Sequence, residues 1–402
     1  MITLYGDTCF TKQVIDTDQL LERKNVSIIN LEGPLLLSTA FNQKAYTPKP
    51  KAGPHLFTPQ EFFDKFHVTV LSLANNHIMD FGEEGLTATV AVSAAKNMMT
   101  IGAGNNEGEA RKYVLLTVDG LKIGIVACCE RQFGSAGVSH AGVAALGPWV
   151  YSVIKAIKQT ADLCMVSSHM GAELCTVPSP YQQDLYRSFI EAGADVVYGH
   201  HSHIPQGYEL YKKGIIFYGL GNFLVDPVHW KDQPNALWSI MVDLLFKRGK
   251  ITTRISTSVC EESDGKIVLR KSNNEESEKH KQYLQKVNLP LQNREFLEGI
   301  WQEVSVLLYH KHFEHYLRSV FDQTRRTSST KEKVLNILKT SLRNKISLTR
   351  TEYLLVYHLF SCESHKEAIA SALGVLSGEL KDLRNEKTKQ YLREMMPWIL
   401  NE

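Results

Sequence analysis

The sequence lacks any pattern of paired cysteines. Its 402 residues include seven cysteines, an odd number, which are scattered along the chain without a C-x-x-C pair. Several of them lie inside apolar runs, as Cys128, Cys129 and Cys164 do. This distribution indicates buried, reduced thiols in a reducing compartment, and a disulfide framework is not expected.

Signals for membranes and nucleic acids are also missing. No apolar stretch reaches the roughly 18–20 residues that cross a bilayer. The N-terminus enters an apolar strand-like stretch at once, without a basic segment and a long apolar run. We therefore expect no membrane span and a cytoplasmic location. A formal net charge of +2 gives no basis for bulk attraction to nucleic acid, which is not expected as a partner.

Short apolar strands alternate with helical segments in the first two thirds of the chain. We expect strands at 1–7, 26–33, 68–77, 121–130, 161–171, 194–203 and 214–223. Apolar residues at helical spacing predict helices at 149–160 and 179–193. This alternation indicates an α/β core with a largely buried sheet. Later strands at 237–251, 251–259 and 265–271 lack intervening helices and predict antiparallel hairpins. We assign residues 1–270 to one domain.

The last third of the chain is almost wholly helical in pattern. A polar segment at 271–282 marks the expected boundary, and we predict a helical domain or cap over 275–402. Helices are expected at 293–321, 331–342, 351–360, 364–374 and 377–396. The rhythm over 348–383 resembles a DNA-reading helix-turn-helix, but no dense basic stripe accompanies it. A helical bundle that packs on the core, or binds a partner or a second copy, is favoured.

Polar side chains recur where the predicted strands end. These are Asp7, Glu32, Asn75, Asn76, His77, Asp80, His169, Glu173, His200, His201 and His203. A parallel sheet aligns the carboxyl ends of its strands on one edge, so these groups can converge there. Since a buried carboxylate or imidazole is costly unless it is paired or metal-bound, a set of this size predicts a metal site.

The types of ligand constrain the metal. Carboxylate, amide and imidazole groups without thiolate suit Mn²⁺, Fe²⁺ or Zn²⁺, with Mg²⁺ also compatible, and argue against a closed structural zinc site. Two ions about 3.5–4 Å apart need a shared anionic bridge, for which Glu32 is the candidate. His201 and His203 leave one turn together, so each can reach a different ion. We expect two divalent metal ions as cofactors.

Several blocks of sequence carry a family resemblance. They are "NLEGP", "LANNHIMDFGEEGL", "IGAGNNEGEA", "SSHMGAE" and "GADVVYGHHSHIPQGYELYKKGIIFYGLGNF", within about residues 1–250. In kind and order they resemble the CapA-type poly-γ-glutamate capsule biosynthesis proteins, of the calcineurin-like metallophosphatase superfamily. The resemblance implies an α/β (α+β) fold with two stacked mixed β-sheets flanked by helices. The helical tail lies outside the resemblance.

The resemblance also implies roles for the polar residues. The metal ligands would be Asp7, Glu32, Asn76, His169, His201 and His203. Asp7 and His203 would serve the first ion, Glu32 would bridge, and the other three would complete the second ion. His77 resembles the histidine that protonates a leaving group or steadies the transition state, and Asp80 would orient it.

The chain departs from the superfamily pattern at a few positions. Cys9 stands where a histidine usually follows the first aspartate, so the first ion would lack a ligand, or take the thiolate or an extra water. Met170 and Ser202 replace a usual tryptophan and proline. "GHHSH" offers two registers, of which His201 and His203 match the family's His-x-His better than a pair with His200.

Substrate contacts are predicted at the loop 46–59 and beside the metal ligands. Lys49 and Lys51 could meet an anionic substrate, although a solvated loop explains them equally well. Glu173 and Asn75 are the other candidates. We expect a metal-dependent hydrolase that cleaves a phosphoester or a γ-glutamyl amide in a small or polymeric anionic substrate. The alternative is a non-catalytic, metal-containing binding or assembly protein for capsule polymer biosynthesis.

Overall fold

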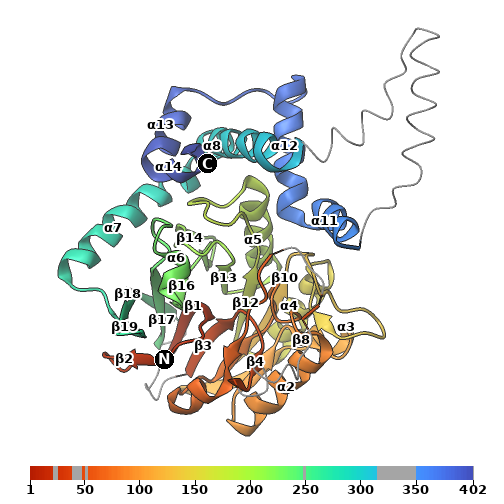
Figure 1. Cartoon of the computed structure of the whole chain (residues 1–402), viewed down its shortest axis with the longest axis vertical. Coiled ribbons are helices and arrows are strands. Elements are labelled where there is room, and N and C mark those ends of the chain that lie inside the picture. Colours follow the sequence, from red (N-terminus) through yellow and green to blue (C-terminus); the bar gives the residue numbers. More distant parts are fainter. Residues whose placement is uncertain (21–25, 39–47, 50–52, 248–249, 315–349, 402) are drawn as a thin grey trace.

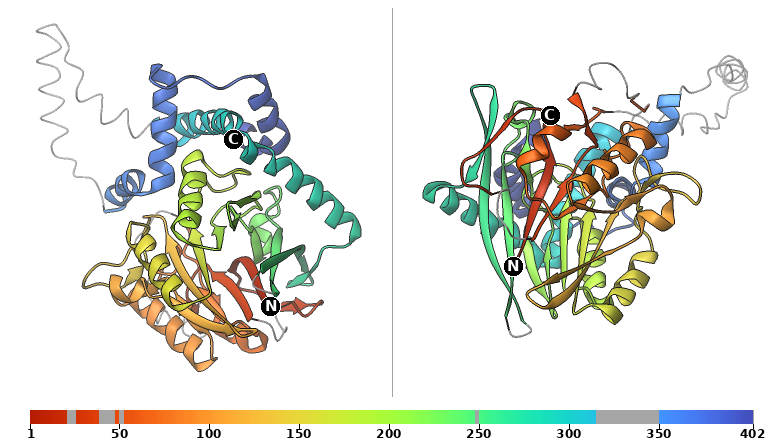
Figure 2. Two further views of the ribbon diagram at one scale, coloured as in Figure 1. Left: turned by 180° about the vertical axis from the view of Figure 1, so that it is seen from behind. Right: turned by 90° about the horizontal axis from the view of Figure 1, so that it is seen from below.

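Two mixed β-sheets stack on one another in the computed structural model, which describes residues 1–20, 26–38, 48–49, 53–247, 250–314 and 350–401 (Figures 1 and 2). Within these residues the first sheet has nine strands. In spatial order they are β2 (Val14–Asp16), β19 (Lys266–Lys271), β18 (Lys250–Ser263), β17 (Trp238–Lys247), β1 (Ile2–Cys9), β3 (Val26–Leu31), β6 (Val70–Ser72) and β7 (Met99–Ile101), with β16 (Asn222–Val225) also beside β1.

The second sheet has six strands in the described part of the chain. Their order is β14 (Tyr208–Tyr211), β15 (Gly214–Phe217), β13 (Val196–His200), β12 (Leu163–His169), β10 (Leu121–Cys129) and β9 (Val114–Val118). Strands β10, β12 and β13 are parallel, and their register aligns Cys129 with His169 and His169 with His200. In the first sheet, parallel β1 and β3 align Asp7 with Asn30. The strand ends therefore bring the polar residues of each sheet to one edge.

The two sheets share one apolar core. Buried side chains of both sheets, such as Ile28, Val70 and Ile125, belong to a single contiguous cluster. The outer face of the second sheet is covered by α4 (Trp149–Thr160) and α5 (Pro180–Ala192). Gly124 permits this packing, because a Cβ atom there would overlap Ile157 of α4. The predicted helices at 149–160 and 179–193 are confirmed.

Shorter elements lie in the connections between these strands. Helix α2 (Gly82–Ala95) contacts β7. The others are β4 (Leu35–Leu36), β5 (Thr58–Pro59), the 3₁₀ turn Gln60–Lys65, β8 (Ala103–Gly104), α3 (Glu107–Ala110), β11 (Gly142–Val143) and α6 (Pro227–Trp230). Strands β17, β18 and β19 pair antiparallel, which confirms the predicted hairpins.

Helices follow the last strand and arch over one end of the sheets (Figure 1). They are α7 (Asn274–Asn288), the turn Pro290–Gln292, α8 (Arg294–Leu308) with a π-turn at Tyr309–Phe313, α11 (Arg350–Ser361), α12 (Glu363–Ser377), α13 (Glu386–Met395) and α14 (Pro397–Asn401). No strand occurs among the described residues after Lys271. Among these helices and the others that the structure describes, none is both long and apolar enough to cross a membrane.

Two details of the helical region differ from the sequence prediction. The polar segment at 271–282, expected to mark a boundary, largely forms α7, because Asn273 and Glu276 cap its first turn reciprocally. The expected helix at 377–396 is broken. Gly378, with φ of 79°, ends α12, and Asn385 caps the start of α13. The helix expected at 331–342 lies outside the described residues.

The helical region packs on the same core as the sheets. Leu284, Val287 and Ile300 are buried in the cluster that the sheets share. The predicted fold class, an α/β (α+β) arrangement of two stacked mixed sheets flanked by helices with C-terminal helices added, is confirmed. The division into domains at 1–270 and 275–402 stays a prediction.

Candidate metal centre

Asp7 lies where the two sheets meet, at the carboxyl end of β1. Its side chain is fully buried, and its Oδ1 accepts a hydrogen bond from Asn30 Nδ2 at 2.9 Å. His200 Nδ1 lies 3.0 Å from the same oxygen, and the backbone N–H of His201 donates to Oδ2 at 3.0 Å. These contacts come from strands of both sheets, so they fix the carboxylate between them.

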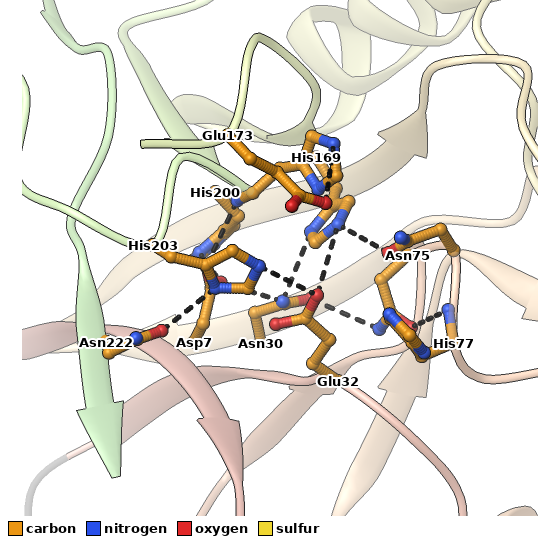
Figure 3. Close-up of polar contacts among 12 residues, drawn as sticks. Asp7, Asn30, Glu32, Asn75, His77, His169, Glu173, His200, His203 and Asn222 are labelled. Carbon is orange, nitrogen blue, oxygen red and sulfur yellow. Dashed lines mark hydrogen bonds and ion pairs between the residues drawn. The ribbon is translucent and has the colours of Figure 1, made fainter. Parts of the chain in front are cut away.

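Glu32 lies at the middle of the polar cluster, directly after β3 (Figure 3). Its Oε1 is 3.7 Å from His169 Nε2 and 3.7 Å from His203 Nε2. Two groups of potential ligand atoms, each within 4.8 Å, share this residue: Glu32 with His169 and His201, and Glu32 with Asp7 and His203. A residue common to two such groups has the placement that a bridging ligand requires.

His169 ends β12 and connects the Glu32 side of the cluster to Asn76. Its Nε2 lies 3.0 Å from Asn76 Oδ1, and its Nδ1 lies 3.3 Å from Asn30 Nδ2. His169 is buried, and Asn76 is only 8% exposed. The Nε2 atom therefore faces both Glu32 and the Asn76 carbonyl, which brings three predicted ligands together.

The charge of the cluster favours a cation. Burial alone would raise the pKa of Asp7, but the contact with His200 holds that pKa below its usual value. Burial opposes protonation of His203, yet the negative charges of Glu32, Glu173 and Asp7 prevail and raise its pKa to about 9. A group of ionised carboxylates that retains a proton on a buried imidazole is also suited to a divalent ion.

Burial disfavours the charged form of two further imidazoles, those of His169 and His201. Burial, with the neighbouring histidines, keeps the pKa of His169 well below its usual value. Burial also lowers the pKa of His201 to about 4. The Nδ1 atom of His201 is buried without a hydrogen-bond partner among the described residues. Metals bind neutral imidazole and ionised carboxylate, so His169 and His201 are already in the form that binds a divalent ion, and an ion would replace the proton on His203.

His77 and Asp80 form a pair on the turn after β6. His77 Nδ1 lies 2.8 Å from Asp80 Oδ2, which also accepts the backbone N–H of Leu56 at 2.8 Å. Both side chains are buried. This pairing is the contact that an orienting role of Asp80 requires, and it fixes the imidazole at the edge of the cluster (Figure 3).

Asn75 shapes this turn from within. It is fully buried, and its Oδ1 accepts the backbone N–H groups of His77 at 3.1 Å and Ile78 at 2.9 Å. Its Nδ2 donates to Leu31 O at 2.7 Å. These bonds engage both ends of the amide, so they favour a positioning role over the substrate contact that the sequence suggested.

The remaining predicted substrate residues lie at the edge of the site. The Glu173 side chain is 56% exposed, with Oε1 3.9 Å from His201 Nε2. Lys49 is exposed, and its backbone N–H donates to Asp80 O at 2.8 Å. Lys51 lies outside the described residues. Glu173 is thus beside a candidate ligand, whereas Lys49 reaches the site through its backbone.

Cys9 does not join the cluster. Its thiol donates to Phe57 O at 3.6 Å, and burial together with the charge of Glu32 raises its pKa far above the usual range. It belongs to none of the candidate ligand groups within the described residues. Of the alternatives that the sequence left open, a thiolate ligand therefore has no support here.

Two further residues contact His201 and were not predicted. Gln132 Nε2 lies 3.1 Å from His201 Nε2, and Glu130 Oε1 lies 3.5 Å from the same atom. Gln132 also donates to Glu130 at 2.7 Å. Glu130 follows β10 directly, so the rule that identified the other strand ends could have found it.

His203 has neighbours of its own. Its Nδ1 lies 3.0 Å from Asn222 Oδ1, and the ring of Trp230 lies 4.5 Å from its ring centre. Asn222 donates to Ala236 O as well, at 3.1 Å, so its amide is held in place. No sequence pattern predicted that Trp230 contacts the site. It stands on α6, a helix of only four residues, and only the fold places that helix beside His203.

Comparison with known proteins places the chain in a family. The family model for the bacterial capsule synthesis protein PGA_cap matches residues 5–227. The chain belongs to the PGA_cap family. It is 32% identical to the capsule biosynthesis protein CapA of Bacillus anthracis over 220 residues, 52% of each chain. It is 34% identical to the PGA biosynthesis protein CapA of Bacillus subtilis, over 46% of this chain and 50% of that one.

The chain spans about half the length of the curated relatives it matches. Among solved structures it is similar to a phosphatase from Mycoplasma pneumoniae, with 13% identity and a TM-score of 0.38. That similarity covers 64% of this chain and 92% of the other. The predicted family resemblance is confirmed by the family model, and it ends before the C-terminal helices, as expected.

Proposed function

We propose that this chain is a metal-dependent hydrolase with two divalent ions at the edge of its stacked sheets. The ligands would be Asp7, Glu32, Asn76, His169, His201 and His203. The observation that carries the proposal is the position of Glu32, whose carboxylate is common to two groups of candidate ligands. Membership of the PGA_cap family supports it independently.

The buried donors suit Mn²⁺, Fe²⁺ or Zn²⁺. When bound, such ions lower the pKa of a water and neutralise charge that develops in the transition state. The chain's own contribution is to hold the donors rigidly, since Asp7 and His169 are each anchored by Asn30. A water-poor site of this kind strengthens every electrostatic contact within it.

His77 is the proposed proton donor to the leaving group. Asp80 accepts from Nδ1, so Nε2 is the atom that would donate to the departing oxygen or nitrogen. Positioned acids of this type contribute typically about 10²–10⁴-fold to a rate. Asp80 acts as a positioning residue, and Asn75 holds the turn on which both stand.

The proposed substrate is anionic. The names of two relatives refer to capsule and PGA biosynthesis, which supports a γ-linked glutamate polymer, cut at a γ-glutamyl amide or at a phosphoester. Glu173 at the exposed rim would contact the substrate or the adjacent His201. Lys49 is proposed as a second contact, through a side chain on the exposed loop beside Asp80.

The test is turnover by the full chain with Mn²⁺ on an aryl phosphoester, a phosphodiester and a γ-glutamyl peptide. We expect His77→Ala to lose about 100-fold or more in kcat while its metal content is unchanged. His229→Ala, which removes an exposed histidine on α6, should behave like the unmodified chain. Turnover of none of these substrates, or equal turnover by His77→Ala, would favour the non-catalytic binding or assembly protein instead.

A further inference from the structure

A second cluster of metal-ligand types lies in the C-terminal helices, outside the part of the chain that matches the family. It consists of His358, Cys362 and His365, whose ligand atoms all lie within 4.8 Å of one another. We propose that these three residues bind a further metal ion, Zn²⁺, independent of the centre at Glu32. Two imidazoles and one thiolate are ligands that Zn²⁺ binds in proteins.

The local fold brings the three residues together. His358 lies in the last turn of α11, Cys362 is the N-cap residue of α12, and His365 lies in the first turn of that helix. The Cys362 N–H donates to His358 O at 3.1 Å, so the connection between the helices is tight. The spacing H-x₃-C-x₂-H therefore converges on one point.

The surroundings suit a bound ion. Cys362 is 1% exposed, and the two histidine rings lie 4.6 Å apart between centres. His365 Nδ1 is buried without a hydrogen-bond partner among the described residues. The rings of Phe133 and Phe313 lie 4.5 Å from His358 and 5.3 Å from His365, which gives the cluster an apolar shell. Aromatic neighbours of this kind exclude water from their side of the cluster.

A carboxylate lies beside the cluster. Glu130 Oε2 accepts hydrogen bonds from the backbone N–H of Ser364 at 3.1 Å and from its Oγ at 2.6 Å, and Ser364 stands between Cys362 and His365 in the chain. Metal ligands commonly have such an outer carboxylate nearby, which helps to orient them. Stacking of two histidines alone would explain the ring distance, but it would not explain the convergence of a buried thiol on the same point.

Three protein ligands leave the fourth position of a tetrahedral zinc open. His358 and His365 line a cavity of about 390 Å³, and Glu173 and His201 line it too. A water or a substrate anion that enters from this cavity would complete the shell. If the proposed hydrolase function holds, the ion would lie across one cavity from the centre at Glu32 and could bind part of the same substrate.

The test uses the full chain with Glu32→Ala, so that the first centre is disabled. We expect this protein to retain about one tightly bound zinc per chain. After exchange with Co²⁺ it should show the near-ultraviolet thiolate-to-cobalt charge-transfer absorption that only a cysteine-ligated site produces. Adding Cys362→Ser or His365→Gln should abolish that absorption. Adding Cys175→Ala, which removes another buried thiol lining the same cavity, or Cys9→Ser should leave it intact.

The outcomes separate this proposal from the function proposed above. Absence of the thiolate absorption in the Glu32→Ala protein overturns the zinc site, whether or not the second substitutions fold. Its loss with Cys9→Ser would also overturn it, because the thiolate would then come from the first centre. A chain that lacks turnover but keeps the Cys362-dependent absorption supports the zinc site while the hydrolase proposal fails.

Discussion

Two hydrogen bonds from one residue connect the C-terminal helices to the sheet edge that carries the candidate metal centre. Ser364, near the start of α12, donates from Oγ to Glu130 Oε2 at 2.6 Å, and its backbone N–H donates to the same oxygen at 3.1 Å. Both residues are buried. We predict that Ser364→Ala lowers the free energy of unfolding by about 2 kcal/mol at pH 8.

The magnitude follows from the charge of the acceptor. A hydrogen bond to a charged group contributes about 1.5–3 kcal/mol, and the backbone N–H of residue 364 would still pair with Glu130. Burial raises the pKa of Glu130 to about 7, against the lowering effect of the Ser364 hydrogen bonds. The serine therefore favours the ionised carboxylate. Its contribution should be largest above pH 7 and smaller at pH 6, where Glu130 is largely protonated.

The assay is urea unfolding followed by circular dichroism at pH 8 and pH 6, with a chelator present throughout. Ser377→Ala is the matched control. Ser377 ends the same helix, is exposed, and its hydroxyl bonds only near neighbours in the chain, Gly374 O and the N–H of Glu379. We expect it to stay within about 0.5 kcal/mol of the unmodified chain. If Ser364→Ala also stayed within that limit at pH 8, the claim that this contact anchors the helices would be wrong.

Three further predictions concern other parts of the molecule. Burial raises the pKa of Glu367 to about 7 from 4.5, so its contribution to stability is lost as pH rises between those values. Glu367→Gln should then raise the free energy of unfolding at pH 8 by up to about 3 kcal/mol, seen as a higher melting temperature, and should have no such effect at pH 4. Equal effects at both pH values would refute this. Asp80→Asn should lower kcat/KM about 10–100-fold at unchanged metal content, by misorienting His77, and unchanged kinetics would count against that pairing. Gly124→Ala should cost about 1–3 kcal/mol in thermal unfolding, because its Cβ overlaps Ile157, and wild-type stability would contradict the packing.

The sequence could predict the candidate centre because its residues follow a simple rule of parallel sheets. Asp7, Glu32 and His169 each stand at or just after the end of a buried strand, and register then brings those ends to one edge. The strands and the hairpins could be predicted for the same reason, since their apolar pattern is local. The ligand types at the strand ends limited the candidate metals to Mn²⁺, Fe²⁺, Zn²⁺ and Mg²⁺, and this step needed no geometry.

Contacts that join distant parts of the chain could not be predicted this way. Ser364 and Glu130 are 234 residues apart, and no local pattern relates them. The direction of the Cys9 thiol, toward Phe57 O, depends on a loop 48 residues away. Asn75 and Asn76 are adjacent and of the same type. The family resemblance singled out Asn76 as the ligand, but that Asn75 bonds the backbone of Leu31 is seen only in the fold.

The central claim is the metal centre that Glu32 holds together, and metal content tests it most directly. The full chain should be expressed with Mn²⁺, purified, and compared with Glu32→Ala by elemental analysis, with His77→Ala as the control that leaves the ligands intact. We predict that Glu32→Ala carries about two fewer ions per chain than the unmodified protein, while His77→Ala keeps all of them. An equal metal content in Glu32→Ala and the unmodified chain would contradict the account.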